Sequence, residues 1–281
     1  MKYSRYHALG NDYLVMSAAD LPQAAPQALI QRICHRNFGV GSDGILVHEP
    51  TRPDGTFSLR IFNPDGSEAE KSGNGLRIFA RYLWDHGLVS EKPFAVSTRG
   101  GQVRCVVGEQ GRNVTVDMGS VSFSSSRIPV QGAEREVLRE RLEVGGEEVL
   151  FCAATIGNPH CVVLDGDVTR ATAERLGPLL ERHPLFPNRT NVQFLKVVSR
   201  SAIQIEIWER GAGYTLASGS SSSAAAAVAY RLGLVDSEIS VIMPGGAIAI
   251  RIGEDLSIRM SGSVTRICDG VIYPEALEPL A

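Results

Sequence analysis

The chain repeats itself at a spacing of 146 residues, and this duplication limits the possible fold more than any other feature of the sequence. The segment Ser72-Gly73-Asn74-Gly75 opens a stretch that ends at Gly87-Leu88-Val89. The segment Ser218-Gly219-Ser220-Ser221 opens a second stretch, which ends at Gly233-Leu234-Val235. Both stretches run 15 residues from serine to glycine (87 − 72 and 233 − 218), and the serines are 146 residues apart (218 − 72). A fixed spacing of this kind indicates two copies of one structural unit.

Two further pairs of segments keep nearly the same spacing. Ile61-Phe62-Asn63 lies 146 residues before Ile207-Trp208-Glu209 (207 − 61), and Gly10-Asn11 lies 147 residues before Gly157-Asn158 (157 − 10). One match arises easily by chance in a chain rich in glycine and alanine, but three pairs of segments at nearly the same spacing indicate a duplication. The length of 281 residues also suits two domains of roughly 150 residues each.

Each copy carries the same signals for local structure. Ser72 and Ser218 are good helix N-caps, and Gly87 and Gly233 suit the left-handed position that follows a helix. We therefore predict a central helix in each copy. Outer helices are predicted at 27–36 and 172–181, and strands at 13–16, 58–61, 102–107, 113–117, 161–164, 193–198, 202–208 and 247–252. Strands around two kinds of helix, without a series of βαβ units, predict an α+β fold.

The two Ser-Gly helix starts suggest a chemistry. A helix N-terminus presents N–H groups and the positive end of a dipole, so it binds an anion without a basic side chain. Two such starts, facing each other across a cleft, would hold a small carboxylate with one serine on each side of its α-carbon. That arrangement suits removal of a proton from one face and return of a proton to the other. Taken alone, each serine is only a cap, and the duplication is what favours the functional interpretation.

Charge and composition exclude several other classes of protein. Lys and Arg number 28 against 31 Asp and Glu, a net charge of −3, so we expect no nucleic-acid partner. No apolar stretch reaches the roughly 18 to 20 residues that cross a bilayer, and no signal peptide is recognisable, so we expect a cytoplasmic protein with no membrane partner. The cysteines form no CxxC pair or Cys/His cluster, so we expect buried thiols and no metal site. They are Cys34, Cys105, Cys152, Cys161 and Cys268.

Six motifs, in one order along nearly the whole chain, resemble the diaminopimelate epimerase family. Each motif is modest alone, but the set is specific and extends from about residue 3 to residue 273. The motifs are Gly10-Asn11-Asp12, Asn63-Pro64-Asp65-Gly66-Ser67-Glu68, Gly73-Asn74-Gly75-Leu76-Arg77, Gly157-Asn158-Pro159-His160, Arg189-Thr190-Asn191-Val192 and Glu209-Arg210-Gly211-Ala212-Gly213.

The resemblance implies a fold and an activity. The fold would be α+β, with two pseudo-symmetric domains that are each a strand barrel around a central helix, at 1–118 plus 264–281 and at 119–263. A C-terminal strand around 266–272 would return to the first domain. The activity would be a cofactor-independent amino-acid epimerase or racemase of lysine biosynthesis. Its active site would lie between the domains, its ligand would be a small amino acid, and a homodimer is a further expectation.

The resemblance also implies roles for particular residues. The reacting α-carboxylate would lie on the backbone N–H groups of Gly73, Asn74, Gly219 and Ser220. The far end of the substrate would be held by Asn63, Asn158, Asn191, Glu209 and Arg210. Asn11 would line the pocket, and His160 and Glu209 would tune the acid/base pair. Glu209 beside Arg210 suits an end group with both an ammonium and a carboxylate, because Arg can bind a carboxylate through two hydrogen bonds.

The chain departs from the family at the two acid/base positions. The family has cysteines there, and this chain has Ser72 and Ser218. A thiol near pKa 8.5 is easily made a base at a helix N-terminus, whereas a serine hydroxyl normally needs an adjacent base. Three explanations fit: natural divergence or loss of the reaction, a Cys-to-Ser variant made to trap a complex, or a slower reaction carried by serines. Tyr214 and the run Ser220–Ser223 also depart from common family patterns, which favours natural divergence.

Three functions therefore remain open. The first is an amino-acid epimerase or racemase of the diaminopimelate epimerase type, with Ser72 and Ser218 as acid and base. The second is a related isomerase with another substrate, in which His160 or Glu209 is the working base. The third is a catalytically silent protein that keeps the pocket to bind a small amino acid.

Overall fold

The computed structural model describes residues 1–21, 26–164 and 166–277, and these form two compact units. Unit 1 is Met1–Val116 with Gly262–Ala281, and unit 2 is Asp117–Ser261. The chain passes from unit 1 to unit 2 within strand β8 (Asn113–Ser120) and returns within strand β17 (Ser257–Ser263).

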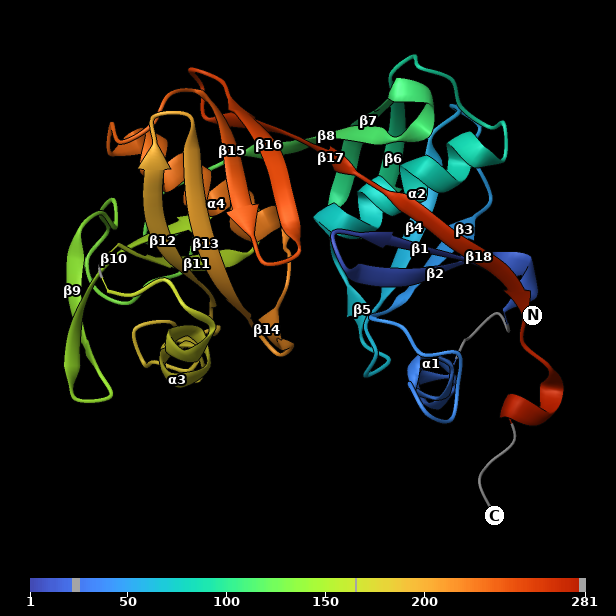
Figure 1. The fold of residues 1–281 in the computed structure, drawn as a ribbon, viewed down its shortest axis with the longest axis horizontal. Helices are drawn as coiled ribbons and strands as arrows, with labels where there is room; N and C mark the ends of the chain where they lie inside the picture. The colour runs from blue at the N-terminus through green and yellow to red at the C-terminus, as the bar shows by residue number, and fades with distance from the viewer. Residues whose placement is uncertain (22–25, 165, 278–281) are drawn as a thin grey trace. The chain divides into compact units, whose positions relative to one another are not determined.

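Apart from one additional strand at the start of unit 2, the two units are built from the same order of helices and strands (Figure 1). Before β8, unit 1 contains β1 (Lys2–Ala8), β2 (Asn11–Ser17), α1 (Gln27–Cys34), β3 (Ile45–Glu49), β4 (Phe57–Phe62), β5 (Glu68–Ala69), α2 (Gly73–Asp85), β6 (Phe94–Thr98) and β7 (Gly101–Gly108). Before β17, unit 2 contains β9 (Glu140–Val144), β10 (Glu147–Thr155), β11 (Pro159–Val163), α3 (Arg170–Glu181), β12 (Asn191–Ser199), β13 (Ala202–Glu209), β14 (Gly213–Thr215), α4 (Gly219–Arg231), β15 (Glu238–Met243) and β16 (Gly246–Ile252). The last strand, β18 (Thr265–Val271), belongs to unit 1.

Strand pairing repeats along with the order of elements. In unit 1, β2 pairs with β3 in parallel, β3 with β4 antiparallel, and β4 with β6 in parallel. In unit 2, β11 pairs with β12 in parallel, β12 with β13 antiparallel, and β13 with β15 in parallel. The duplication predicted from sequence spacing is therefore confirmed in the topology. The strand that was expected to return to the first domain is confirmed as well, because β18 pairs with β1.

The central helices begin and end where their capping residues predict. Ser72 has φ −137° and ψ 120° and caps α2, while Ser218 has φ −147° and ψ 125° and caps α4. Gly87 and Gly233 follow the two helices at φ 68° and φ 71°, which a glycine adopts without strain. The outer helices are also confirmed. Helix α1 ends two residues earlier than predicted, and α3 begins two residues earlier because Thr169 is its N-cap.

Strands surround each central helix. Every residue of α4 from Ser221 to Ala229 is buried, and the helix packs on β10, β11, β12, β13, β15 and β16 (Figure 1). Its interior hydroxyls are satisfied locally, since Ser222 Oγ and Ser223 Oγ each donate to the carbonyl four residues earlier at 2.8 Å. Helix α2 packs in the same way on β1, β2 and β7. Each unit is therefore a strand barrel around a central helix.

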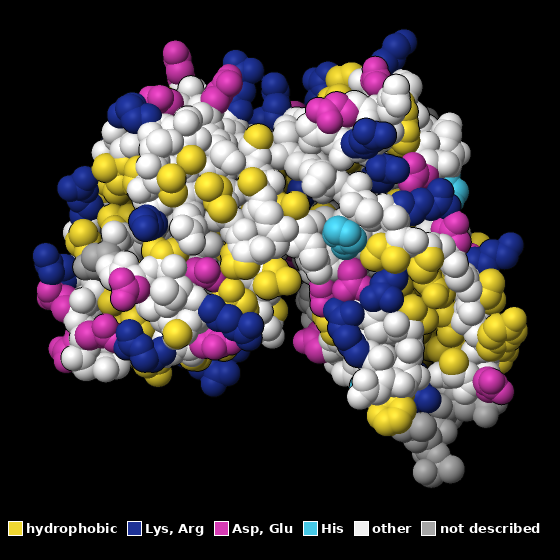
Figure 2. All heavy atoms as spheres, viewed as in Figure 1, with side chains coloured by type: hydrophobic (Ala, Val, Ile, Leu, Met, Phe, Trp, Pro, Cys, Tyr) yellow, Lys and Arg dark blue, Asp and Glu magenta, His cyan; other side chains and the backbone are white. Residues whose placement is uncertain are grey.

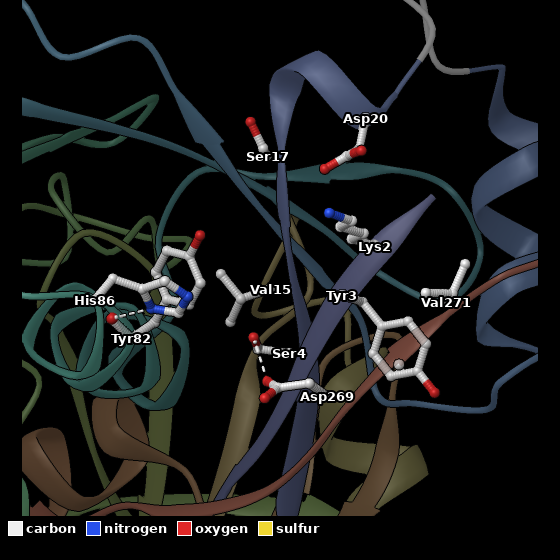
Figure 3. A pocket seen from close by; sticks show the side chains of 11 residues that line it. Lys2, Tyr3, Ser4, Val15, Ser17, Asp20, Tyr82, His86, Asp269 and Val271 are labelled. Atoms are coloured by element: carbon white, nitrogen blue, oxygen red, sulfur yellow. Dashed lines mark hydrogen bonds between the residues drawn. The ribbon is translucent and has the colours of Figure 1, made fainter.

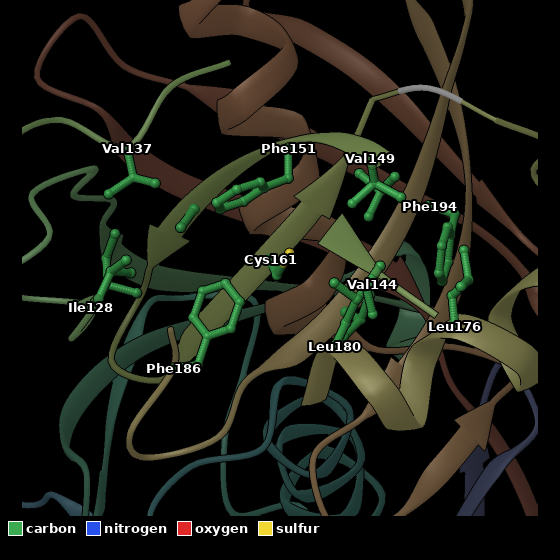
Figure 4. Close-up of a cluster of buried hydrophobic side chains, with 14 of the residues drawn as sticks. Ile128, Val137, Val144, Val149, Phe151, Cys161, Leu176, Leu180, Phe186 and Phe194 are labelled. Carbon is green, nitrogen blue, oxygen red and sulfur yellow. The ribbon is translucent and has the colours of Figure 1, made fainter. Parts of the chain in front are cut away.

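The main apolar core of unit 2 lies between its strands and α3 (Figure 4). Phe151 and Phe194 come from the strands, and Leu176 and Leu180 come from one face of α3. Burial of each such side chain stabilises the fold by about 1.5–3 kcal/mol. This packing holds α3 against the strand ends that carry several of the predicted site residues.

All eight predicted strands are present, but the sequence interpretation missed several others. It missed β3, whose apolar run Ile45-Leu46-Val47 is short and lacks alternation, and β9, whose residues are mostly charged. Short runs of this kind become strands because a neighbouring strand pairs with them, as β4 does with β3 and β10 does with β9.

The surface corrects one prediction about the cysteines. Cys34, Cys105, Cys152 and Cys161 are buried, but Cys268 is exposed, because it lies on β18, where most side chains face solvent. On the face drawn in Figure 2, Lys and Arg side chains are interspersed with Asp and Glu. Across the described parts of the chain, no helix has the length and apolar character to span a membrane.

Candidate active site

Ser72 lies at the start of α2 in unit 1. Its Oγ accepts a hydrogen bond from Gly75 N at 3.0 Å and lies 3.4 Å from the hydroxyl of Tyr13 on β2. A side chain at Gly75 would crowd this contact, because a Cβ there would lie 3.2 Å from Ser72 Oγ and 3.1 Å from Leu46. Gly44 plays a similar part, since its Cβ would lie 2.6 Å from the Tyr13 ring. Two glycines thus let the Ser72 hydroxyl and the Tyr13 ring approach each other.

Asn74 and Asn11 are joined in the same unit. Asn74 Nδ2 donates to Asn11 Oδ1 at 3.0 Å, and Asn11 Nδ2 donates to Asp43 Oδ2 at 3.0 Å. Arg77 lies one turn along α2 and donates to Asn74 Oδ1 at 2.6 Å. Arg77 is fully buried, and burial lowers its pKa to about 10. Asn74 is therefore fixed from both sides at the helix start.

Asn63 forms its hydrogen bonds with a different segment of unit 1. It begins the turn between β4 and β5, where its Nδ2 donates to Ser67 Oγ at 2.9 Å and its backbone N donates to Ser67 O at 2.9 Å. Gly66, at φ 81°, closes the turn by donating to Asn63 O. These bonds hold the Asn63 side chain at the base of a tight turn.

Ser218 begins α4 in unit 2 and is buried. Its Oγ accepts from Ser221 N at 3.4 Å, the same N-cap bond that Ser72 makes in unit 1. Ser221 Oγ accepts in turn from Gln193 Nε2 on β12 at 3.0 Å. Ser221 and Gln193 are both fully buried, so this bond ties the first turn of α4 to the neighbouring strand.

Asn158 and His160 lie beside the start of α4. His160 Nε2 lies 2.9 Å from Asn158 Oδ1 and donates to it, while Asn158 Nδ2 donates to Ser220 Oγ at 3.4 Å. The pKa of His160 is lowered to about 3, mainly by burial; its interaction with Gln193 opposes this shift, and the charge of Arg210 adds to it. His160 is therefore neutral near pH 7, and its hydrogen bond positions Asn158.

Asn191 and Arg210 form a second group in unit 2. Arg210 N donates to Asn191 Oδ1 at 3.0 Å, and Asn191 Nδ2 donates to Pro159 O at 2.8 Å. The Arg210 guanidinium is exposed and donates from Nη1 to Asn188 O at 3.0 Å. Glu209 ends β13 and is half-buried. The chain thus presents Glu209 and Arg210 together at the turn between β13 and β14.

Within each unit, the fold brings most of the predicted residues together. Unit 1 joins Asn11 to Asn74 two residues from Ser72, and unit 2 joins His160, Asn158 and Ser220 beside Ser218. Sequence interpretation missed Tyr13, Asp43 and Gln193, which contact these groups directly. The sequence pattern of Tyr13 and Gln193 indicates only strands. Asp43 follows a glycine-rich segment, and that was the one signal available for it.

A cavity of about 470 Å³ lies elsewhere on unit 1 and contains none of the predicted residues (Figure 3). Its lining includes Ser4, which donates to Asp269 at 2.7 Å, and His86, whose Nδ1 lies 2.8 Å from Tyr82 O. In the described ranges, no group of three or more His, Cys, Asp or Glu side chains is arranged to hold a metal ion.

Comparison with known proteins identifies what the chain is similar to. The family model for diaminopimelate epimerase matches residues 3–124 and 152–267. Diaminopimelate epimerase 2 of Nostoc sp. is 60% identical over 275 residues, which cover 98% of this chain and 96% of that protein. Diaminopimelate epimerase of Desulfitobacterium hafniense is 40% identical over 285 residues, which cover 99% of this chain and all of that protein, 100%. The resemblance drawn from the six motifs is therefore confirmed.

A solved structure supports the fold independently. The hydroxyproline epimerase from Agrobacterium vitis superposes with a TM-score of 0.72 at 16% identity, covering 100% of this chain and 94% of that chain. At this identity the likeness concerns the fold alone. It confirms the predicted α+β architecture of two barrel units.

Proposed function

The chain belongs to the diaminopimelate epimerase family of isomerases, and from this premise we propose that it inverts the α-carbon of diaminopimelate between the LL and meso forms. Ser72 and Ser218 would occupy the two acid/base positions. The reaction requires no cofactor, and we place it in the cytoplasm. A cofactor-independent amino-acid epimerase or racemase is the broader class to which this activity belongs.

The observation that carries the proposal is the matched pair of helix starts. Ser72 and Ser218 have nearly the same φ and ψ, and each accepts from the backbone N–H three residues later. The first N–H groups of a helix lack acceptors within the helix, so they are suited to an anion. We assign the substrate α-carboxylate to the N–H groups of Gly73, Asn74, Gly219 and Ser220.

The groups around Asn158 and Arg210 support a substrate with a charged far end. The Arg210 guanidinium is exposed, next in the chain to the half-buried carboxylate of Glu209. Together they match an end that carries a carboxylate and an ammonium. Asn158, which is held by His160 and precedes the Pro159 carbonyl that binds Asn191, would supply a further amide. We assign Asn63 and Asn191 to the same end of the substrate and Asn11 to the pocket wall.

The reaction balances with two hydroxyl groups. One serine, as the alkoxide, takes the α-proton from one face, and the other serine gives its proton to the opposite face of the carbanion. Backbone amides donate to Ser72 Oγ and Ser218 Oγ, the Tyr13 hydroxyl lies 3.4 Å from Ser72 Oγ, and the helix N-termini favour negative charge at both serine oxygens. A hydroxyl is still far less acidic than a thiol, so we expect turnover slower than that of a cysteine pair.

Hydrogen exchange at the α-carbon tests the proposal. We expect the protein, incubated with LL-diaminopimelate in D₂O, to incorporate one deuterium at the α-position and to form the meso isomer. Incorporation at another position, or elimination, would instead identify a different isomerase in which His160 or Glu209 is the base. Tight binding of diaminopimelate without any exchange would identify a silent binding protein.

We further propose that the protein is a homodimer. Large hydrophobic side chains are exposed on unit 1, including Phe38 at 51%, Val271 at 55% and Tyr273 at 70%. Together they border an apolar groove, and Figure 2 shows hydrophobic side chains gathered on unit 1. Light scattering should give about twice the mass of 30.3 kDa, and a monomer at micromolar concentration would contradict this part of the proposal.

A further inference from the structure

Glu181 is a charged residue on the buried face of a helix. It ends α3, whose buried residues are Ala173, Leu176, Gly177, Leu180 and Glu181. These positions follow the spacing of a helix face that packs against a core. Glu181 is only 3% exposed, and a buried carboxylate is costly unless it is paired and hydrogen-bonded. The Glu181 carboxylate therefore needs specific hydrogen-bonding and ionic partners.

Three donors from two other segments meet the Glu181 carboxylate. Oε1 accepts from Gly211 N at 3.1 Å and lies 3.1 Å from Arg189 Nη2, and Oε2 accepts from Trp208 Nε1 at 2.8 Å. The Glu181 backbone carbonyl also accepts from Thr190 N at 3.1 Å. The buried carboxylate is thus hydrogen-bonded by two N–H donors and paired with one guanidinium, which offsets the cost of burying it.

Two of these donors flank Glu209 and Arg210 in the sequence. Trp208 precedes them and Gly211 follows them, so Glu181 holds both ends of the four-residue segment. Helix α3 also packs closely against Trp208 at Gly177, where a Cβ would lie 2.5 Å from the indole ring. Gly211 has φ 79°, and Ala212 N donates to Glu209 O at 3.1 Å to close the turn. The turn is thus attached to the end of α3 through one side chain.

Glu181 also acts on the segment that leads to Asn191. Its bonds to Arg189 and to Thr190 N hold the two residues before Asn191. Asn191 Oδ1 in turn accepts from Arg210 N at 3.0 Å. A single buried carboxylate therefore joins the loop before β12 to the turn after β13.

We propose that Glu181 is a positioning residue, which fixes Glu209 and Arg210 for recognition of the charged far end of the substrate. This inference rests on the proposed function, because it concerns the same ligand. Glu181 does not touch the substrate. It fixes the positions of Glu209 and Arg210 in folded unit 2 before the substrate binds.

Glu181→Gln is the most direct test. Glutamine keeps the shape but has one carbonyl oxygen and an NH₂ donor, so either Trp208 or the Gly211–Arg189 pair would face a donor. We expect the dissociation constant for diaminopimelate to rise about tenfold. Norleucine lacks the far ammonium and carboxylate, so we expect its dissociation constant to change less than twofold. Hydrogen exchange of the 208–212 amides should accelerate in the same variant.

Matched variants separate positioning from general stability. Glu174→Gln removes an exposed ion pair with Arg170 on the same helix and should leave both ligands and the 208–212 amides unchanged. Trp208→Phe retains the ring against Gly177 but removes one donor, and should weaken diaminopimelate binding in the same selective way if Glu181→Gln does not fold.

The outcomes are distinct. Equal weakening of both ligands, or unchanged exchange at 208–212, would overturn the positioning role. If the wild-type protein bound norleucine as tightly as diaminopimelate, the proposed recognition of the far end would fail instead, whatever the exchange of the turn.

Discussion

Arg210 and Asn191, 19 residues apart, are joined by a hydrogen bond of 3.0 Å from the Arg210 backbone N–H to Asn191 Oδ1. Asn191 Nδ2 donates on the other side to Pro159 O at 2.8 Å. Asn191 is buried, so both ends of its amide are engaged within unit 2. In the structure it joins the segments that carry Asn158 and Arg210, and its predicted contact with the substrate remains a prediction.

The first prediction concerns this amide. Asn191→Asp would retain an acceptor for Arg210 N but place a second carboxylate oxygen against Pro159 O. We expect a loss of about 1–3 kcal/mol in the free energy of unfolding, because a buried acceptor then has no donor. Urea denaturation at pH 7 measures this change in the free energy of unfolding. Asn188→Asp, at an exposed position two residues from Thr190, should change stability by less than about 0.5 kcal/mol; equal effects of the two variants would refute the argument.

The second prediction concerns the exposed guanidinium. Arg210→Ala should weaken diaminopimelate binding by about 2 kcal/mol, or roughly 30-fold, because a desolvated carboxylate of the ligand would lose its charged partner. Isothermal titration calorimetry measures the change. Arg200→Ala, which removes an exposed ion pair with Asp236, provides the control. Unchanged affinity in Arg210→Ala would mean that Glu209 and Arg210 have a structural role only.

The third prediction concerns pH. Burial lowers the pKa of His160 from 6.5 to about 3, so below pH 6.5 the unfolded chain takes a proton that the folded chain does not. The free energy of unfolding should therefore fall as the pH drops from about 6.5 toward 3, by at most about 1.4 kcal/mol per pH unit from this group. His160→Gln should reduce that slope between pH 6 and pH 4.

His183 is a suitable comparison for the pH experiment. Burial lowers its pKa too, but it is much less buried than His160. His183→Gln should therefore change the slope less than His160→Gln. A His160→Gln variant whose unfolding free energy keeps the wild-type pH dependence would show that folding does not lower the pKa of His160.

The fourth prediction concerns the two serines. Ser72→Cys and Ser218→Cys together should greatly raise α-proton exchange on diaminopimelate, because a general acid or base typically contributes about 10²- to 10⁴-fold. The single variants should do much less, since inversion needs a base on one face and an acid on the other. Solvent deuterium incorporation, followed by mass spectrometry, measures both. A folded double variant with no more exchange than wild type would show that the surrounding pocket has diverged as well.

The sequence alone determined the features that depend on local hydrogen bonds and on repetition. Ser72, Ser218, Gly87 and Gly233 mark the ends of the central helices, because N-caps and left-handed C-terminal positions act within a few residues. The repeated spacing predicted the duplicated topology, and the motifs identified the family. Neither result required knowledge of which strands pair.

Tertiary structure decided which side chains meet. Tyr13 approaches Ser72 from 59 residues away, Gln193 holds Ser221 from 28 residues away, and Glu181 reaches Gly211 across 30 residues. In the sequence, Glu181 is recognisable only as a charged residue on the apolar face of its helix. The three donors that bind it are brought together by the fold. Such contacts escape sequence patterns because they depend on pairing between strands and on the packing of α3, where burial, rather than local propensity, makes a polar partner obligatory.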